Sequence, residues 1–369
     1  MKLISMLLKI VFVFGLLAII VFLFLQQKPF GKLPSGTRLE KVKSSSHYQN
    51  GRFINIIETP LIAKGSSYWK LMTKFLGKGI DRAPEKPIPF VKKNLTSDVG
   101  RNPRIIWFGH SSYLISLHGK NILVDPVFSR RASPVQYAGM KSYEGTNACT
   151  AEDMPEIDLL VISHDHYDHL DYNSILALRS KVKQFCTPLG VGQHLAHWGI
   201  DENKITELDW WQSHSFLSGF EIMATPARHF SGRGLTNNKT LWASFVLKTN
   251  DYRIFIGGDS GYDNSFKDIG IKYGPFDLAM LECGQYGAQW PSVHMMPEEV
   301  AQASVDLQAK VLMPVHWAKF TLALHPWKEP MERLTKKAAL LGVKLTTPVV
   351  GESVVLNEVY PAQQWWKNL

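Results

Sequence analysis

Apolar and polar positions alternate in short runs through the last two thirds of the chain. From residue 104 onward, short apolar runs are bounded by turn residues, which is the pattern of buried β-strands. A first series of strands is expected at Arg104–Phe108, Tyr113–Leu117, Asn121–Val124 and Leu159–Ile162. A second series is expected at Phe220–Ala224, Leu241–Lys248, Tyr252–Ile256, Leu278–Leu281 and Val311–Val315. Helices are expected at Tyr172–Ser180, Pro297–Leu307 and Pro330–Leu341. Two strand-rich halves with outer helices predict an α/β fold, an αβ/βα sandwich.

A long apolar segment precedes this region. From Leu3 to Leu25 the chain is apolar except for Ser5 and Lys9. Roughly 23 residues at a rise of about 1.5 Å span the ~30 Å hydrocarbon core of a bilayer. A cleaved signal peptide is the alternative, but the apolar stretch is long for a signal core and no small-x-small cleavage site follows it. We therefore expect the first 27 residues to be an uncleaved, single-pass membrane anchor that forms one helix.

The segment 28–103 is rich in lysine and proline and is expected to be a basic linker and lead-in, with one helix around Ser67–Leu76. Residues 104–369 are expected to form the main domain. Basic residues are more numerous after the apolar segment than before it, and such an excess marks the cytoplasmic side of a membrane. The sequence therefore favours a cytoplasm-facing domain. Export of the domain is the alternative, because large folded domains can be exported regardless of nearby charge.

A dense group of histidines and carboxylates follows one predicted strand. Directly after Leu159–Ile162 the chain reads Ser-His164-Asp-His166-Tyr-Asp168-His169. Imidazole nitrogens and carboxylate oxygens suit zinc and similar divalent ions, and a strand leading into a loop can aim several of them at one point. The two alternate histidines can share one ion, while Asp168 and His169 can hold a second. The pattern predicts a site for two metal ions.

Four ligands from one loop cannot complete two sites, so other strand ends must contribute. His229, Asp259 and His316 each follow a predicted strand of the second series. The carboxyl ends of strands are where open sheets commonly gather their ligands. The chain shows no Gly-x-Ser-x-Gly nucleophile elbow, and none of its three cysteines falls within these motifs. The order of these residues therefore indicates metal-dependent chemistry without a protein nucleophile.

The charge of the chain and its distribution indicate which class of partner the protein binds. The formal net charge is +9 and the isoelectric point is near 9.2, while a hydrophobic fraction of 45% with 20% charged residues is that of a globular protein. Lysine and arginine are concentrated between Lys28 and Arg104, next to the apolar segment. This placement suits anionic lipid headgroups. A nucleic-acid partner would require a basic stripe near the metal loop, and the sequence has none, so we expect a membrane and no nucleic acid.

In these motifs the chain resembles a known family, the metallo-β-lactamase-fold hydrolases. Within that family it is most similar to the N-acylphosphatidylethanolamine-hydrolysing phospholipase D type. The metal motif carries the general resemblance. The closer resemblance spans roughly residues 84–340 and rests on Gly109-His110-Ser-Ser, Val124-Asp125-Pro-Val-Phe128-Ser, Gln136-Tyr137, Gly258-Asp259-Ser-Gly261-Tyr262, Gly274-Pro275-Phe276-Asp277-Leu278-Ala279, His294 and His316-Trp317. It implies that residues 104–369 are a catalytic domain with the metallo-β-lactamase αβ/βα sandwich.

The resemblance also implies roles for individual residues. It assigns one metal to His164, His166 and His229, the other to Asp168, His169 and His316, and a bridging position to Asp259. It further implies that Asp168 and His294 are catalytic, that Gln136 and Tyr137 contact the substrate phosphate or the metal loop, and that Tyr167 lines a lipid pocket. Asp125 is expected to orient a metal-bound histidine from behind, because such histidines usually donate their second nitrogen to a carboxylate or carbonyl. His110 is interpreted as a turn residue.

These assignments predict a membrane-anchored phosphodiesterase that hydrolyses a phospholipid in the manner of a phospholipase D. Two divalent ions, with zinc as the first expectation, lower the pKa of a shared water and produce a bridging hydroxide. A metal-dependent lactonase or other ester hydrolase is the alternative enzyme, since the same ions can direct hydroxide at a carbonyl carbon. A non-enzymatic membrane regulator is the alternative outside enzymes. The sequence leaves open the headgroup, the acyl chains and the oligomeric state, including a homodimer.

Overall fold

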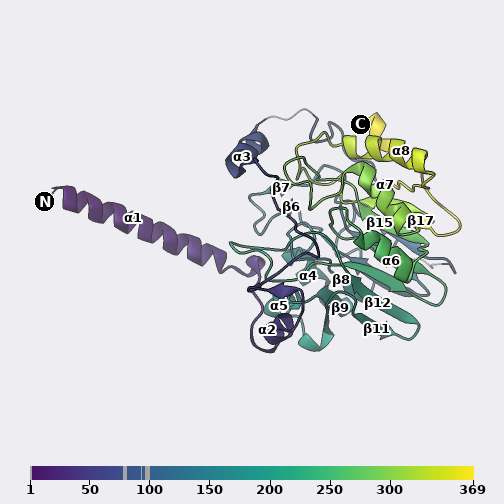
Figure 1. The fold of residues 1–369 in the computed structure, drawn as a ribbon, viewed down its shortest axis with the longest axis horizontal. Coiled ribbons are helices and arrows are strands. Elements are labelled where there is room, and N and C mark those ends of the chain that lie inside the picture. Colours follow the sequence, from purple (N-terminus) through teal and green to yellow (C-terminus); the bar gives the residue numbers. More distant parts are fainter. Residues whose placement is uncertain (1, 78–80, 93, 96–99) are drawn as a thin grey trace.

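Two β-sheets form the centre of the main domain in the computed structural model, which describes residues 2–77, 81–92, 94–95 and 100–369 (Figure 1). The first sheet has seven strands, in the spatial order β10 (Ile205–Leu208), β9 (Val182–Pro188), β8 (Ile157–Val161), β5 (Lys120–Val124), β4 (Tyr113–Leu117), β3 (Arg104–Trp107) and β17 (Ser353–Val355). The second has six strands, in the order β11 (Ser213–Leu217), β12 (Phe220–Thr225), β13 (Ser244–Lys248), β14 (Arg253–Ile256), β15 (Leu278–Glu282) and β16 (Leu312–Val315). The expectation of two strand-rich halves is confirmed.

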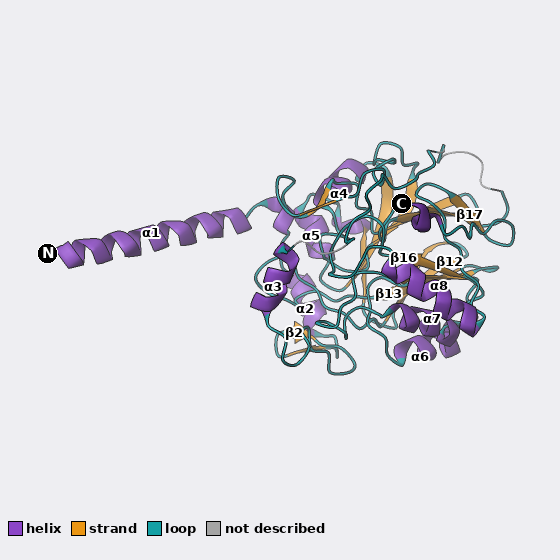
Figure 2. Cartoon of the chain, turned by 90° about the horizontal axis from the view of Figure 1, so that it is seen from above, coloured by secondary structure: helices purple, strands orange, loops and turns teal. Residues whose placement is uncertain are grey.

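Helices cover the outer faces of both sheets (Figure 2). They are α4 (Tyr172–Leu178) and α5 (Gly192–His197) beside the first sheet, and α6 (Ser265–Tyr273), α7 (Pro297–Asp306) and α8 (Glu329–Leu341) beside the second. Because both faces are covered, central strands are buried throughout. All five residues of β4 are buried, with Leu114 facing one apolar cluster and its neighbours Tyr113 and Ile115 facing the other. The expected strands match these elements closely, whereas β9, β10, β11, β17, α5 and α6 were not anticipated.

The N-terminal helix α1 (Lys2–Leu25) projects away from the domain (Figure 1). Its stretch Ile4–Leu25 has a mean hydropathy of 3.0 and none of it is buried inside the protein. The helix is therefore long and apolar enough to cross a membrane.

The lead-in contains more secondary structure than the single helix that we expected around Ser67–Leu76. It forms η1 (Lys28–Phe30), α2 (Gly36–Lys43), the β1 (Tyr48–Gln49) and β2 (Arg52–Phe53) hairpin and α3 (Tyr68–Leu76). Val42 and Phe53 are fully buried in the main core, and the Arg38 guanidinium lies 2.6 Å from the Glu207 carboxylate. Because these contacts join positions far apart in the sequence, the local pattern gave no sign of them. Much of the described lead-in is thus part of the folded domain.

Candidate metal centre

The predicted ligands meet where strands of both sheets end. The loop from His164 to His169 follows β8, while His229, Asp259 and His316 follow β12, β14 and β16. Glycines allow the close approach, since a Cβ at Gly258 would lie 2.9 Å from the Ser163 side chain. Five of the seven predicted ligands are at most 4% exposed, and the seven lie together in overlapping clusters of potential metal-binding atoms. The structure thus brings together the whole predicted ligand set.

His164, His166 and His229 form the first cluster. The His166 Nδ1 atom lies 2.9 Å from His164 Nε2 and 3.3 Å from His229 Nε2. Nitrogen ligands on one tetrahedral zinc ion, at about 2.0–2.1 Å from it, would be ~3.3 Å apart. The second ring nitrogens of two of these histidines are held from behind: His164 Nδ1 lies 3.0 Å from Ser163 Oγ, and His229 Nδ1 lies 2.8 Å from the Val293 carbonyl oxygen.

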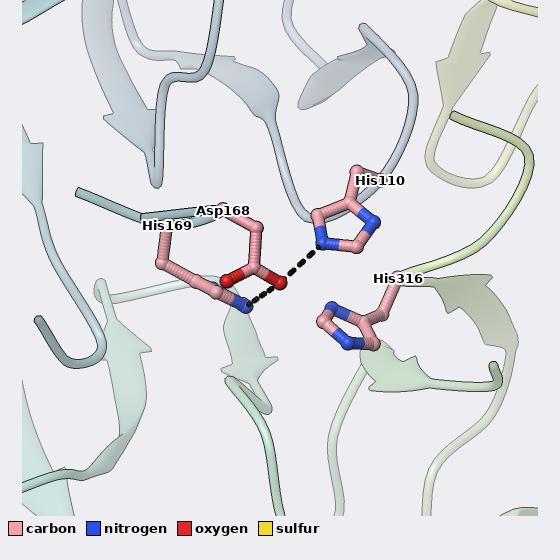
Figure 3. A group of neighbouring side chains, drawn as sticks. All are labelled: His110, Asp168, His169 and His316. Atoms are coloured by element: carbon pink, nitrogen blue, oxygen red, sulfur yellow. Dashed lines mark hydrogen bonds and ion pairs between the residues drawn. The ribbon is translucent and has the colours of Figure 1, made fainter. Parts of the chain in front are cut away.

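Asp168, His169 and His316 belong to the second cluster, with His110 (Figure 3). Asp259 lies between the two clusters. Its Oδ2 atom is 3.2 Å from His169 Nε2 and 3.8 Å from both His164 Nε2 and His229 Nε2, and its Oδ1 atom is 3.1 Å from His316 Nδ1. A carboxylate with one group of imidazoles on each side has the arrangement of a bridging ligand.

The electrostatics of both clusters favour cations. Burial lowers the pKa values of His164, His229 and His316, which keeps these imidazoles neutral and able to ligate. Burial would also lower the pKa of His169, but Asp259 and Asp168 outweigh it and raise that pKa. His169 Nε2 and Asp259 Oδ1 are buried without a hydrogen-bond partner. Buried polar atoms of this kind are costly unless a ligand satisfies them, so the residues present fit a divalent metal centre.

Asp125 lies where the orienting role requires it. Its Oδ2 atom accepts a hydrogen bond from His169 Nδ1 at 2.8 Å and from the Ser163 hydroxyl at 2.6 Å. Its Oδ1 atom accepts a hydrogen bond from the Ser163 backbone N–H at 2.8 Å. One buried carboxylate therefore fixes both His169 and the start of the metal loop.

His110 has more contacts than a turn residue needs. It does occupy a turn, with a φ of 53°, but it is fully buried, and its Nε2 atom lies 2.9 Å from Asp168 Oδ2 (Figure 3). It thereby holds the carboxylate of a predicted ligand. Sequence reasoning gave this residue little weight, although its position at the end of β3 repeats the strand-end placement of the ligands.

Glu282, the last residue of β15, was missed altogether. It is fully buried, and its Oε2 atom lies 3.0 Å from His294 Nδ1, while its Oε1 atom accepts the Met295 backbone N–H at 2.9 Å. Burial would lower the pKa of His294, but the Glu282 carboxylate outweighs it and raises that pKa. The pair holds the His294 ring at the edge of the site and keeps a proton available there.

A cavity of about 380 Å³ opens beside the clusters. His166, Asp168, Asp259, His294 and His316 form its polar floor. Its apolar side comes from Leu61, Ile62, Leu71, Phe75, Phe230, Trp290, Val293 and Leu322. The site thus combines metal-binding groups with an apolar wall, part of which the lead-in supplies.

The three predicted substrate contacts are not among the residues that line this cavity. Gln136 and Tyr137 lie in the hairpin of β6 (Arg131–Ala132) and β7 (Met140–Lys141), where Gln136 bonds to the Arg131 backbone and Tyr137 is 77% exposed. The Arg233 guanidinium carbon lies 4.2 Å from the centroid of the Tyr167 ring, and the Tyr167 hydroxyl donates to the Arg233 carbonyl oxygen. The structure therefore places Tyr167 beside the metal loop, outside the wall of this cavity.

Taken together, the two packed sheets and the histidine and aspartate clusters at their edge define a metallohydrolase fold. Residues 120–317 match the family model of the beta-lactamase superfamily domain. The chain belongs to this superfamily of metal-dependent hydrolases.

Relatives of known sequence extend the match. An uncharacterised protein of Mycobacterium tuberculosis is 38% identical over 330 residues, 88% of each chain. The N-acyl-phosphatidylethanolamine-hydrolyzing phospholipase D 1 of Caenorhabditis elegans is 35% identical over 264 residues, 67% of this chain and 74% of that protein. The outer membrane protein RomA of Klebsiella pneumoniae is 56% identical over 95 residues, 26% of this chain and 72% of that protein.

A solved structure supports the fold alone. A metallo hydrolase from Ignicoccus hospitalis superposes with a TM-score of 0.53 at 21% identity, covering 70% of this chain and 100% of that one. The resemblance stated from the sequence motifs is confirmed at the level of the superfamily, and the chain has relatives of the phospholipase D type.

Proposed function

We propose that this protein is a membrane-anchored phosphodiesterase that hydrolyses a phospholipid in phospholipase D fashion, with two divalent ions, preferably zinc. The observation that carries the proposal is the cavity, whose polar floor meets an apolar wall. A phospholipid has the matching division between a charged phosphodiester and apolar chains. The phospholipase D named for the Caenorhabditis relative and the membrane name of the Klebsiella relative support the same assignment.

The residues of the chain would hold the two ions in the sets that the family resemblance implies. His164, His166 and His229 would bind one, Asp168, His169 and His316 the other, and Asp259 both. When bound, such a pair supplies an activated water and stabilises the charge that develops on the phosphate oxygens.

The side chains around the cavity then account for the proton movements. Water attacks the phosphorus, and the bond between phosphorus and the headgroup oxygen breaks. Asp168, which His110 holds at 2.9 Å, would accept the proton of the attacking water. His294, which Glu282 holds at 3.0 Å, would donate a proton to the departing oxygen. The products are a phosphatidic-acid-like lipid and the free headgroup alcohol.

A direct test uses His294. His294→Ala should lower phosphodiester turnover by about 10²-fold, the scale expected for loss of a general acid, while metal content stays unchanged. His118→Ala is the matched control. His118 lies in the turn between β4 and β5, is partly exposed and pairs with Asp251. Turnover and metal content should be measured on a panel of phospholipids, with products identified by mass.

The same panel separates the alternatives. Efficient cleavage of lactones or carboxylic esters without phosphodiester cleavage would favour an ester hydrolase of the same fold. Absence of turnover in a fully metal-loaded protein would favour a non-enzymatic membrane regulator. The complete and buried ligand set argues against that regulator, since a protein without turnover would be free to lose its ligands.

A further inference from the structure

The helix α3 is apolar on two sides. Leu71 and Phe75, one turn apart, line the metal cavity. Trp69 and Met72, three residues apart and therefore on one face, are 69% and 45% exposed. The helix thus separates the cavity from the outside while presenting a tryptophan and a methionine to the surroundings.

This exposed face belongs to a helix that is held at both ends. At its carboxyl end the Arg82 guanidinium donates to the backbone carbonyl oxygens of Lys74 at 2.9 Å and Phe75 at 3.4 Å. The Phe75 ring stacks on Trp290, with centroids 6.1 Å apart. Before the helix, the Ala63 backbone N–H donates to the Gln289 carbonyl oxygen at 2.7 Å. The exposure of Trp69 is therefore a property of the folded protein.

The base of α1 is also fixed on the domain. The Phe24 ring packs on Phe30, with centroids 5.1 Å apart. The Arg233 guanidinium donates to the Pro29 carbonyl oxygen at 2.7 Å, and the Trp198 indole N–H donates to the Lys28 carbonyl oxygen at 2.7 Å. These contacts set the direction in which α1 leaves.

In both views α3 lies on the side of the domain from which α1 projects, above the base of α1 in Figure 1 and below it in Figure 2. A bilayer crossed by α1 would present its surface to this side. The charge of the described segment fits such a surface, because Lys64 and Lys74 are exposed and residues 59–77 contain no aspartate or glutamate. Basic residues attract anionic lipid headgroups, and an indole prefers the headgroup region.

We propose that α3 is a membrane-docking helix that inserts Trp69 and Met72 into the surface of the bilayer that holds α1. The partner is a bilayer containing anionic phospholipid. From that position the inner face of α3, with Leu71 and Phe75, guides a lipid into the metal cavity. The guiding role rests on the proposed function, whereas the docking itself does not.

Docking is tested in the full-length protein, reconstituted in vesicles of phosphatidylcholine and phosphatidylserine. A nitroxide is attached to Met72→Cys, since the three native cysteines are buried. The matched control is Ile271→Cys on α6, a residue that is 69% exposed. We expect the label at 72 to be more accessible to oxygen, which dissolves in acyl chains, than to a water-soluble nickel complex, and the reverse at 271. Equal accessibility to the nickel complex at both positions would overturn the docking.

The guiding role is tested by activity. The double variant Trp69→Ala, Met72→Ala should lower kcat/KM on vesicle lipid by at least about tenfold, because two inserted apolar side chains are lost. Turnover of a dispersed short-chain phosphodiester and metal content should be unchanged. The double variant Ile271→Ala, Leu340→Ala, with residues 69% and 75% exposed, controls for the loss of exposed apolar surface elsewhere.

An equal loss on both substrates would overturn the guiding role and assign α3 a purely structural one. An equal loss in the control variant would overturn it as well. Failure of the proposed function is a separate result, in which neither the native protein nor any variant would cleave a phosphodiester. The nitroxide measurement would still decide the docking.

Discussion

The main domain and the lead-in contribute differently to the same site: the main domain supplies the predicted ligands and part of the apolar wall, and the lead-in supplies the rest of that wall. Every predicted metal ligand follows a strand of the main domain, where the sheets are covered on both sides. The described lead-in supplies none of these ligands. It supplies Leu61, Ile62, Leu71 and Phe75 to the apolar wall and reaches the metal site through Asn55, whose amide donates to the His229 carbonyl oxygen at 2.8 Å.

This division separates what must be rigid from what can vary. Metal ligands need positions fixed within a fraction of an ångström, which strand ends in a doubly covered sheet provide. An apolar wall needs only approximate shape. We therefore expect changes in the main domain to alter metal content and chemistry, and changes in the lead-in to alter the preference for lipid while leaving the metals in place.

The largest effect should come from the residue between the two clusters. Asp259→Ala should remove the bridging carboxylate, lower metal content below the two equivalents expected of the native protein, and reduce turnover by about 10³-fold or more. Elemental analysis and turnover check both expectations. Asp251→Ala serves as the control, because the Asp251 side chain is 66% exposed and lies in a surface loop.

A native protein that is folded yet holds only traces of divalent metal would contradict the dinuclear interpretation. Full metal content in Asp259→Ala would contradict the bridging role of that residue. Only the first result would remove metal binding as a difference between the main domain and the lead-in.

Removal of residues 1–27 tests the membrane side of the comparison. The truncated protein should keep its metals and hydrolyse a dispersed short-chain phosphodiester, but act about 10²-fold less well on vesicle lipid, because the substrate is no longer held in two dimensions beside it. The full-length protein should remain with membranes after high-salt and carbonate washes, whereas attachment by basic residues alone would be released by salt. A mature protein that begins near Gln26 and is wholly soluble would contradict the anchor.

The difference between the main domain and the lead-in also explains which features of the site could be predicted from the sequence. The meeting of the predicted ligands was foreseeable because their motifs come in the loops that follow apolar strands, so local pattern and residue chemistry coincide. His110 and Asp168 are 58 positions apart, and their contact depends on how two strand ends meet in space. Glu282 ends a strand that was predicted, but nothing in the local pattern indicates that His294 is its partner.

The lead-in was harder to interpret for a related reason. Its contacts with the main domain, such as that between Arg38 and Glu207, join residues 169 positions apart and follow no period. A segment rich in lysine and proline therefore looked like a linker. Its wall residues, Leu71 and Phe75, have ordinary helical spacing, which predicts a helix but not the cavity on which it packs.

Gly31→Ala should break the contact between the lead-in and the main domain. Gly31 has a φ of 76°, and a Cβ there would lie 2.1 Å from Nδ1 of the buried His194. Gly36→Ala is a matched control, because Gly36 also has a positive φ, of 57°, but no atom within 4 Å of its Cβ. Both variants carry the cost of an alanine in the left-handed region, about 1 kcal/mol, and only Gly31→Ala adds the clash, a further ~2 kcal/mol.

The measurement is hydrogen exchange along residues 28–58 together with the free energy of unfolding. Faster exchange in the lead-in of Gly31→Ala, with the core strands still protected, would confirm that the segment is docked by this contact. Equal behaviour of the two variants would mean that the packing at His194 contributes little. Metal content should remain unchanged in both.

The smallest effect, and the one that most sharpens the comparison, concerns the wall itself. Phe75→Ala removes an aromatic ring that faces the cavity and stacks on Trp290, while leaving every predicted ligand in place. Because about 1–2 kcal/mol of contact with an acyl chain is lost, KM for a long-chain lipid should rise about tenfold, with little change on a short-chain phosphodiester. Phe90→Ala is the control, since Phe90 also lies in the lead-in but is 51% exposed and does not line the cavity. Equal losses on long and short substrates would show that the lead-in affects the chemistry as well as the lipid, and the separation between the two regions would fail.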